Sequence, residues 1–292
     1  MPDLLVLGTR GSQLALAQSG QVAEQITRAS GVPVRLEVIS TKGDRVQDRP
    51  LPEVGGKGLF TAELEQALRD GGIDLAVHSL KDLPTEMPEG LTLGAVPERA
   101  DPRDVLVGST VEALWPGAIV GTGSARRATQ LKALRPDVEI LGIRGNVDTR
   151  LRKLHEGPYD AIVLAAAGLA RLGLEVEGQR LDPRLCLPAP GQGALGVQCR
   201  AGDADVLGVL ASIEDRATRL RVTAERAFLE AIAGGCSVPA GALATLDGVA
   251  LTLRVVLADA SGQLHHAERT GLAADAEALG RSLGEALRAV VP

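Results

Sequence analysis

Short apolar runs alternate with amphipathic stretches through the first hundred residues of the chain. Residues 4–8 (LLVLG) are apolar and end in glycine, and residues 12–29 follow with apolar positions at a helical spacing and with Ser12 as a natural N-cap. This order of elements is typical of a mostly parallel sheet with helices on both faces. The same patterns predict strands at residues 33–40, 73–80 and 91–97, a polar, glycine-rich loop at residues 42–58 and a helix at residues 59–72.

The pattern starts again near residue 100. Its opening, IVGTGSARRATQL, is similar to VLGTRGSQLAL in the first unit. In each segment a strand ends in Gly-Thr, and a serine and an arginine follow at the turn into a helix. We therefore expect two similar α/β lobes with a cleft between them. Residues 187–200 (LPAPGQGALGVQCR) are expected to return the chain to the first lobe. The second unit is predicted to have strands at 118–121, 138–143 and 159–165 and helices at 122–134, 144–157 and 166–173.

A different pattern follows the helical residues 216–235. The odd positions from Val249 to Leu257 are all apolar, which predicts a strand, and residues 259–263 (DASGQ) predict a turn. The last helix has one apolar face, formed by Leu279, Leu283, Leu287 and Val290. The fold class is therefore α/β, with two doubly wound lobes followed by a small, antiparallel α+β domain.

Length and composition narrow the class of protein. A chain of 292 residues accommodates two or three domains, and 45% apolar and 23% charged residues are ordinary for a globular protein. The chain has no run of the ~20 apolar residues that a membrane span needs, and its start does not resemble a signal peptide, so we expect a cytoplasmic location and no membrane partner. A net charge of -6 and four aromatic residues argue against nucleic-acid binding.

The three cysteines are expected to be reduced thiols. Cys186, Cys199 and Cys236 are odd in number and widely spaced, which argues against a disulfide framework. They form no CxxC pair, and the four histidines form neither an i, i+4 pair nor a cluster with them. We therefore predict no metal held by protein ligands alone.

Polar and basic residues gather where predicted strands pass into helices. At the carboxyl ends of strands in an open α/β sheet, free helix N–H groups and guanidiniums bind anions. The lysine of GGKGLF is not followed by Ser or Thr, and GQGALG follows LPAP and not a strand, so neither is a phosphate loop. A small molecule with several carboxylates is the favoured ligand. The three turns contain Thr9, Arg10 and Ser12; Thr122, Ser124, Arg126 and Arg127; and Arg144, Asn146 and Arg150.

Two further positions have both a chemical and a structural interpretation. Asp82, in HSLKDLP, is either part of a solvated strand end with Lys81 or a partly desolvated carboxylate that moves protons and stabilises a cation. Cys236, in AIAGGCSVPAG, is either an inert core thiol or an exposed one behind Gly234 and Gly235, suited to covalent attachment or nucleophilic attack.

The chain resembles the porphobilinogen deaminase family, also called hydroxymethylbilane synthases, from residue 9 to about residue 245. The resemblance implies domains at residues 1–97 with 194–212, at 102–189 and at 216–292, the first two like the lobes of periplasmic binding proteins. It also implies a cytoplasmic, monomeric transferase of tetrapyrrole and heme biosynthesis that acts on porphobilinogen. The resemblance rests on TRGSQLALAQ, VGGKGLF, DLAVHSLKDLPT, ADPRD, GTGSARR, IRGNVDTRL, YDAIVLAAAGLARLGL, LPAPGQGALGVQCR, RVTAERAFL and GGCSVPAGA, in the family's order.

The resemblance also implies roles for individual residues. Cys236 matches the cysteine that carries a dipyrromethane cofactor as a thioether, and Asp82 matches the catalytic group that assists ammonia loss, stabilises positive pyrrole nitrogens and helps proton removal. Four porphobilinogen molecules are expected to join head to tail on the cofactor before hydrolysis releases hydroxymethylbilane. The positions that hold acetate and propionate groups are matched by Arg10, Ser12, Lys81, Thr122, Ser124, Arg126, Arg127, Arg144 and Arg150. Lys57 and Phe60 would lie on or beside a mobile loop over the site, and Gln192 would shape the cleft near the crossover.

The sequence differs from the family pattern at one position, and it leaves two other classes of protein as alternatives. Glu53 stands where some family members have lysine, which puts one loop contact to a carboxylate in doubt. A two-lobed binding protein of the periplasmic type is expected to have an export signal and needs no thiol. A thiol-dependent transferase or hydrolase would use Cys236 on an anionic substrate.

Overall fold

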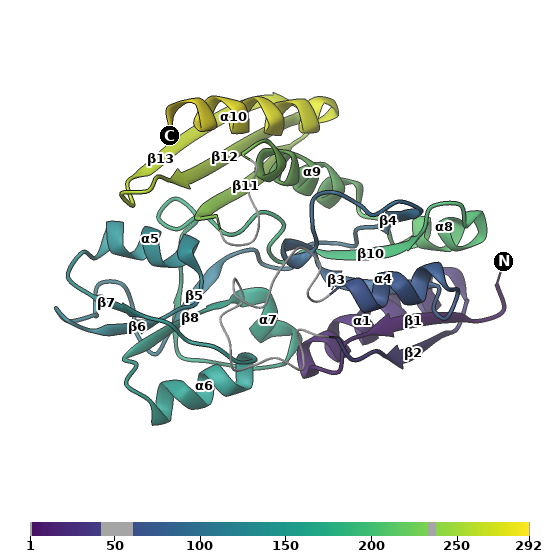
Figure 1. Cartoon of the computed structure of the whole chain (residues 1–292), viewed down its shortest axis with the longest axis horizontal. Helices are drawn as coiled ribbons and strands as arrows, with labels where there is room; N and C mark the ends of the chain where they lie inside the picture. The colour runs from purple at the N-terminus through teal and green to yellow at the C-terminus, as the bar shows by residue number, and fades with distance from the viewer. Residues whose placement is uncertain (1, 42–60, 233–237, 292) are drawn as a thin grey trace. The chain divides into compact units, whose positions relative to one another are not determined.

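The computed structural model describes residues 2–41, 61–232 and 238–291 of the chain (Figure 1). The chain divides into two compact units, the first comprising Met1–Arg99 and Ala194–Arg219 and the second Ala100–Gly193 and Leu220–Pro292. The second unit contains two of the three sheets, so the predicted boundaries of the three domains stay a prediction.

The first unit is built on a five-stranded sheet in the order β2-β1-β3-β10-β4. β1 pairs in parallel with β2 and β3, whereas β10 runs antiparallel to both β3 and β4. Half of the pairings are therefore antiparallel, because β10 arrives from much later in the chain, and the expected mostly parallel sheet is a mixed one. The strands are β1 (Leu5–Thr9), β2 (Val34–Val38), β3 (Leu75–Ser79), β4 (Leu91–Ala95) and β10 (Leu195–Arg200).

Helices cover both faces of this sheet. Val22 and Ile26 of the first helix pack with Leu75 in one core, and Leu64 and Leu68 of the next helix belong to a second core. The strands are buried from both sides, as a doubly wound lobe requires. The predicted N-cap is confirmed, since the Ser12 Oγ accepts the Ala15 N–H at 3.3 Å. The helical elements are α1 (Gln13–Ser30), α4 (Ala62–Arg69), η1 (Leu80–Asp82), α8 (Ala204–Leu210) and η2 (Ala211–Ile213).

The second unit repeats this arrangement with the order β7-β6-β8-β5-β9. β6 pairs in parallel with β7 and β8, and β5 runs antiparallel to β8 and β9. Val105 and Leu106 lie in different cores, so this sheet is also buried on both faces. Two similar α/β lobes are thus confirmed. The elements of the second lobe are β5 (Asp104–Val107), β6 (Ile119–Gly121), α5 (Ala125–Leu134), β7 (Glu139–Leu141), α6 (Val147–Glu156), β8 (Ala161–Ala165), α7 (Ala166–Arg171) and β9 (Gly178–Arg180).

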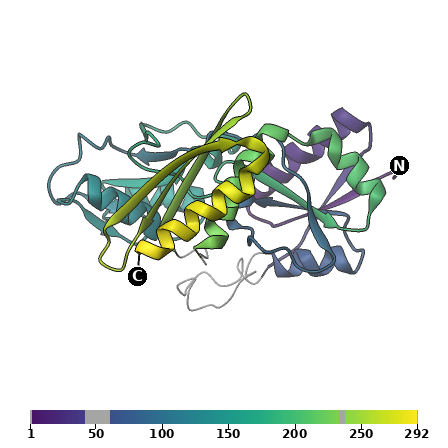
Figure 2. The same ribbon diagram turned by 90° about the horizontal axis from the view of Figure 1, so that it is seen from above.

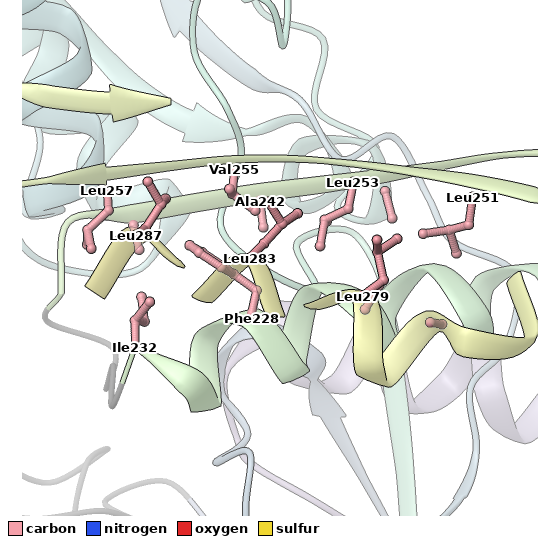
Figure 3. Close-up of a cluster of buried hydrophobic side chains, with 14 of the residues drawn as sticks. Phe228, Ile232, Ala242, Leu251, Leu253, Val255, Leu257, Leu279, Leu283 and Leu287 are labelled. Atoms are coloured by element: carbon pink, nitrogen blue, oxygen red, sulfur yellow. The ribbon is translucent and has the colours of Figure 1, made fainter. Parts of the chain in front are cut away.

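A three-stranded antiparallel sheet and two helices form the small C-terminal domain, as predicted. α10 lies over one face of the sheet (Figure 2), and Phe228, Leu253 and Leu283 meet in the core between sheet and helices (Figure 3). A Cβ on Gly280 would lie 2.1 Å from the carbonyl oxygen of Ala224, so glycine allows the two helices to pack closely. The elements are α9 (Arg216–Ala231), β11 (Ala240–Asp247), β12 (Ala250–Ala258), β13 (Leu264–Leu272), η3 (Ala273–Asp275) and α10 (Ala276–Val290).

Two apolar positions assigned to this core lie at its edge. Val249 is 75% exposed because it lies in the turn before β12, and Val290 is 60% exposed because it is the last residue of α10. The other members of both predicted stripes are buried. Periodicity therefore identified the faces correctly and extended each by one residue at an element end.

Among the described residues, no helix has both the length and the apolar character needed to cross a membrane.

Candidate functional site

The first polar edge lies where β1 ends and α1 begins. The fully buried Thr9 accepts a hydrogen bond from the Ser19 hydroxyl at 2.8 Å and donates to the Ala15 carbonyl at 3.2 Å, which joins the strand end to the first turns of the helix. Ser12 uses its oxygen as the N-cap acceptor, and its hydroxyl hydrogen can still be donated. Arg10, half-buried between Thr9 and Ser12, is thus held at a fixed helix N-terminus.

Lys81 and Asp82 lie at the same edge of the sheet, because β3 is parallel to β1. They belong to the short turn η1, which is anchored by the buried side chains of Leu80 and Leu83 and by a 3.0 Å hydrogen bond from the Leu80 N–H to the Ala194 carbonyl. Lys81 is half-buried and Asp82 is exposed. Of the two interpretations of Asp82, the exposed side chain fits the solvated strand end and not the partly desolvated carboxylate, because only the apolar residues of the turn face the core. The catalytic role of Asp82 stays a prediction.

His78 supports this strand end and was not among the predicted site residues. Its Nε2 lies 3.0 Å from the Oε1 of Gln198 on β10, and both side chains are buried. Burial lowers the pKa of His78 to about 4, since the charged ring would lose its hydration. The imidazole is therefore neutral at neutral pH and donates its Nε2–H to the amide oxygen. In the sequence, His78 belongs to no motif or metal-ligand cluster, so nothing there indicated its role.

The second polar edge lies at the carboxyl ends of β6, β7 and β8, which run parallel. Thr122 is buried, and its Oγ1 accepts the Ser124 N–H at 3.2 Å. A Cβ on Gly123 would lie 3.0 Å from the Ile143 carbonyl oxygen, so glycine permits this close turn. Ser124 is the N-cap of α5, and its side chain makes no capping bond.

Arg126 and Arg127 are directed into the protein. They are only 3% and 6% exposed, and both contact Asp104, which is fully buried at the start of β5. Arg126 Nη1 lies 2.8 Å from Oδ2, and Arg127 Nη2 lies 2.7 Å from Oδ1. Burial alone would raise the pKa of Asp104, but the two guanidiniums hold it well below its usual range. The two arginines, predicted to bind ligand carboxylates, thus have an internal carboxylate partner, and their contact with a ligand stays a prediction.

Arg144 and Arg150 flank the start of α6. Both are half-buried, and Arg150 donates from Nε to the Gly145 carbonyl at 2.8 Å. Gly145 has φ +117°, a conformation that side-chain-bearing residues rarely adopt. α6 has no fully buried residue, so it presents these arginines from the surface of the unit.

Gln192 lies in the loop before β10 and is 1% exposed. Its Nε2 donates to Oδ1 of Asp104 and to the Pro102 carbonyl, each at 2.8 Å. It thus belongs to the same buried polar group as the two arginines of α5.

Sequence reasoning missed Arg171, the last residue of α7. Its Nη2 donates to the Gly193 carbonyl at 2.8 Å, and no carboxylate pairs with it among the described residues. Burial lowers the pKa of this guanidinium to about 10, which still leaves it charged at neutral pH. A half-buried guanidinium that has no carboxylate partner in the described part of the chain is a candidate for binding an anion. In the sequence, an arginine at a helix C-terminus indicated only a favourable interaction with the helix dipole.

Several predicted residues fall outside the described ranges. These are Glu53 and Lys57 of the predicted loop, Phe60 just after it, and Cys236. The other two cysteines, Cys186 and Cys199, are free and buried.

Hydroxyls, guanidiniums and helix N-termini thus lie at the carboxyl ends of strands in each α/β lobe. This arrangement is typical of proteins that bind a small molecule with several negative charges. Comparison with known proteins identifies the family. Residues 5–208 match the family model of the porphobilinogen deaminase dipyromethane cofactor binding domain, and residues 219–289 match that of the porphobilinogen deaminase C-terminal domain.

Curated relatives match nearly the whole chain. A porphobilinogen deaminase of Roseiflexus castenholzii is 53% identical over 292 residues, covering 98% of this chain and 96% of the relative. One of Syntrophobacter fumaroxidans is 49% identical and covers 97% of this chain and 94% of the relative. The chain belongs to the porphobilinogen deaminase family. The predicted family, its enzyme class and its dipyrromethane cofactor are thereby confirmed, and the binding-protein and other thiol-enzyme alternatives are excluded.

Solved structures of lower similarity were also found. The methionine binding protein MetQ is 12% identical with a TM-score of 0.44, and the match covers 75% of this chain and 93% of that one. An ancestral cationic amino acid solute binding protein is 17% identical with a TM-score of 0.44, covering 72% and 88%.

Proposed function

We propose that this chain deaminates porphobilinogen, joins four molecules head to tail on a dipyrromethane group held by Cys236, and releases hydroxymethylbilane. We further propose that it acts as a cytoplasmic monomer without a nucleic-acid partner. The observation that carries the proposal is the surplus of guanidinium donors at the second polar edge. Arg126 Nε is buried without a hydrogen-bond partner in the described part of the chain, and Arg171 has no carboxylate partner there.

These donors fit a chain of pyrroles. Each pyrrole bears an acetate and a propionate, so every added unit brings two carboxylates that guanidiniums bind well. When bound, the dipyrromethane group supplies the free pyrrole carbon to which the first substrate is joined. The residues proposed to bind its carboxylates and those of the substrate are Arg10, Ser12, Lys81, Thr122, Ser124, Arg126, Arg127, Arg144 and Arg150, with Arg171 added.

Asp82 is the proposed catalytic carboxylate. Its exposed position at the end of β3 leaves the carboxylate accessible to a bound pyrrole. There it stabilises positive charge on the pyrrole nitrogen as ammonia leaves, and it accepts the proton that is lost when the new bond forms. Lys57 and Phe60 are proposed to lie on or beside a loop that covers the site, and Gln192 is proposed to shape the cleft near the crossover.

Intact-protein mass tests the proposal. The purified chain should be heavier than its sequence by two linked pyrrole units, the Cys199→Ala control should carry the same increment, and Cys236→Ser should lack it and form no product. A fully active chain at its sequence mass would overturn the proposal. Light scattering should give a single chain of 30.2 kDa, and a larger particle would contradict the monomer.

A further inference from the structure

Asp104 is a fully buried carboxylate that lies outside the residues predicted from the sequence. Three side chains donate to it. Arg126 Nη1 contacts Oδ2 at 2.8 Å, and Gln192 Nε2 contacts Oδ1 at 2.8 Å. Arg127 contacts Oδ1 twice, from Nε at 3.1 Å and from Nη2 at 2.7 Å. Each residue that donates to Asp104 is also a residue of the proposed site.

The position of Asp104 follows from the sheet. β5 runs antiparallel to β8, and Asp104 is in register with Ala165, the last residue of β8. The start of β5 therefore lies at the same edge as the carboxyl ends of the parallel strands. This places a carboxylate beneath the first turn of α5, where the two arginines lie.

A shared partner is needed because Arg126 and Arg127 are consecutive in a helix. Consecutive side chains leave a helix about 100° apart, so the two guanidiniums would otherwise diverge. Asp104 draws both to one carboxylate. Backbone carbonyls complete the arrangement, since Arg126 Nη1 also donates to Leu187 at 2.7 Å and Arg127 Nη1 to Val163 at 2.9 Å.

The charges within this group do not cancel. Two guanidiniums share one carboxylate, which leaves one formal positive charge. The neighbouring Cys186 thiol does not offset it, because burial raises its pKa to about 11 and keeps it neutral. Arg126 contacts the Cys186 thiol, and its Nε has no hydrogen-bond partner among the residues that the structure describes. A buried, positively charged group is complementary to an anion.

We infer that Asp104 is a positioning residue for carboxylate binding: it fixes Arg126, Arg127 and Gln192 at the polar edge and does not itself contact the pyrrole chain. This inference rests on the proposed function. If Asp104 served only to neutralise buried charge, a small displacement of its carboxylate would affect stability alone. If it orients the arginines, the same displacement also weakens cofactor loading and substrate binding.

Two variants and one control separate these roles. Asp104→Asn removes the charge, and Asp104→Glu keeps the charge but moves the carboxylate by about 1.5 Å, the length of one carbon–carbon bond. Asp101→Asn is the control, because Asp101 is a half-buried carboxylate three residues away that pairs with Arg103 instead. Folding is followed by thermal unfolding, cofactor loading by intact mass, and binding by the KM for porphobilinogen.

We expect both Asp104 variants to show a lower fraction of loaded chains and a KM raised by about 10-fold to 100-fold, with kcat per loaded chain changed much less. The control should match the parent. Folded variants with parental loading and KM would overturn the inference, and so would the failure of both variants to fold, because Asp104 would then be purely structural. A parental chain without the mass increment or turnover would instead refute the proposed function, and this inference with it.

Discussion

Gln18 Nε2 donates a hydrogen bond to Ser79 Oγ at 2.8 Å. The two residues are 61 positions apart, and the bond joins the second turn of α1 to the last residue of β3. It therefore links the helix that begins beside Arg10 to the strand end that carries Asp82. Gln18 is 6% exposed, so water cannot readily replace this contact.

Replacing Gln18 should loosen that strand end. Gln18→Met keeps the side-chain length and removes the donor, so we expect the free energy of unfolding to fall by about 1 kcal/mol and turnover to fall several-fold with unchanged cofactor loading. Gln25→Met, at an exposed position of the same helix, is the control. Denaturant unfolding and steady-state kinetics measure both effects. Parental turnover in the folded Gln18 variant would contradict a role at the site.

Asp82→Asn should abolish most turnover and spare substrate binding. The amide keeps the shape of the side chain but neither stabilises a cation nor accepts a proton at neutral pH, so kcat should fall by ~10²-fold or more. Asp70→Asn removes another exposed carboxylate of the same unit and should behave like the parent. Single-turnover kinetics with porphobilinogen separates binding from chemistry. An unchanged kcat would remove Asp82 from the mechanism.

α6 carries a matched pair for testing carboxylate binding. Arg150 is half-buried in its first turn, whereas Arg152 is exposed and lies 3.8 Å from Glu156. Arg150→Met should raise the KM for porphobilinogen by about 10-fold, the cost of losing one charge-assisted contact. Arg152→Met should leave it unchanged. Equal effects of the two substitutions would indicate general charge and not a specific site.

Stability should fall on acidification because of His78. Its folded pKa of about 4 lies below the ordinary value of 6.5, so between these pH values the unfolded chain binds a proton that the folded chain does not. Stability therefore rises with pH through this window, by on the order of 3 kcal/mol, and is independent of His78 above it. His78→Gln should flatten the dependence, and the exposed His155→Gln should not. Urea unfolding at several pH values gives the slopes, and identical slopes for parent and His78→Gln would contradict the burial of a neutral ring.

The two described thiols should resist alkylation in the native protein. Burial raises the pKa of both Cys186 and Cys199 to about 11, so at pH 8 only ~0.1% of either is the reactive thiolate. Iodoacetamide followed by peptide mapping should modify neither residue until the chain is unfolded. The Cys236→Ser variant should therefore take up no label when native. Rapid labelling of Cys186 in the native protein would show that the core around this thiol opens to solvent.

The sequence by itself determined the family and many of the helices and strands, although it did not predict β5, β9, β11 or β13. Helical and strand periodicity depends on neighbours within a few residues, which is why the Ser12 cap and the Leu283 stripe were predictable. The Gly-Thr turns into helices marked both polar edges for the same local reason. Motif order then pointed to the family that the comparisons established.

Only the tertiary structure decided which polar side chains face inward and what they contact. Arg126 lies 22 residues from Asp104, and His78 lies 120 residues from Gln198. Such partners are brought together by sheet order and register, in which β5 lies antiparallel to the later strand β8, and β10 lies antiparallel to the earlier strand β3. A local pattern identifies a charged turn but does not contain this long-range pairing. The burial of two arginines around Asp104, and the exposure of Asp82, therefore became visible only in the folded chain.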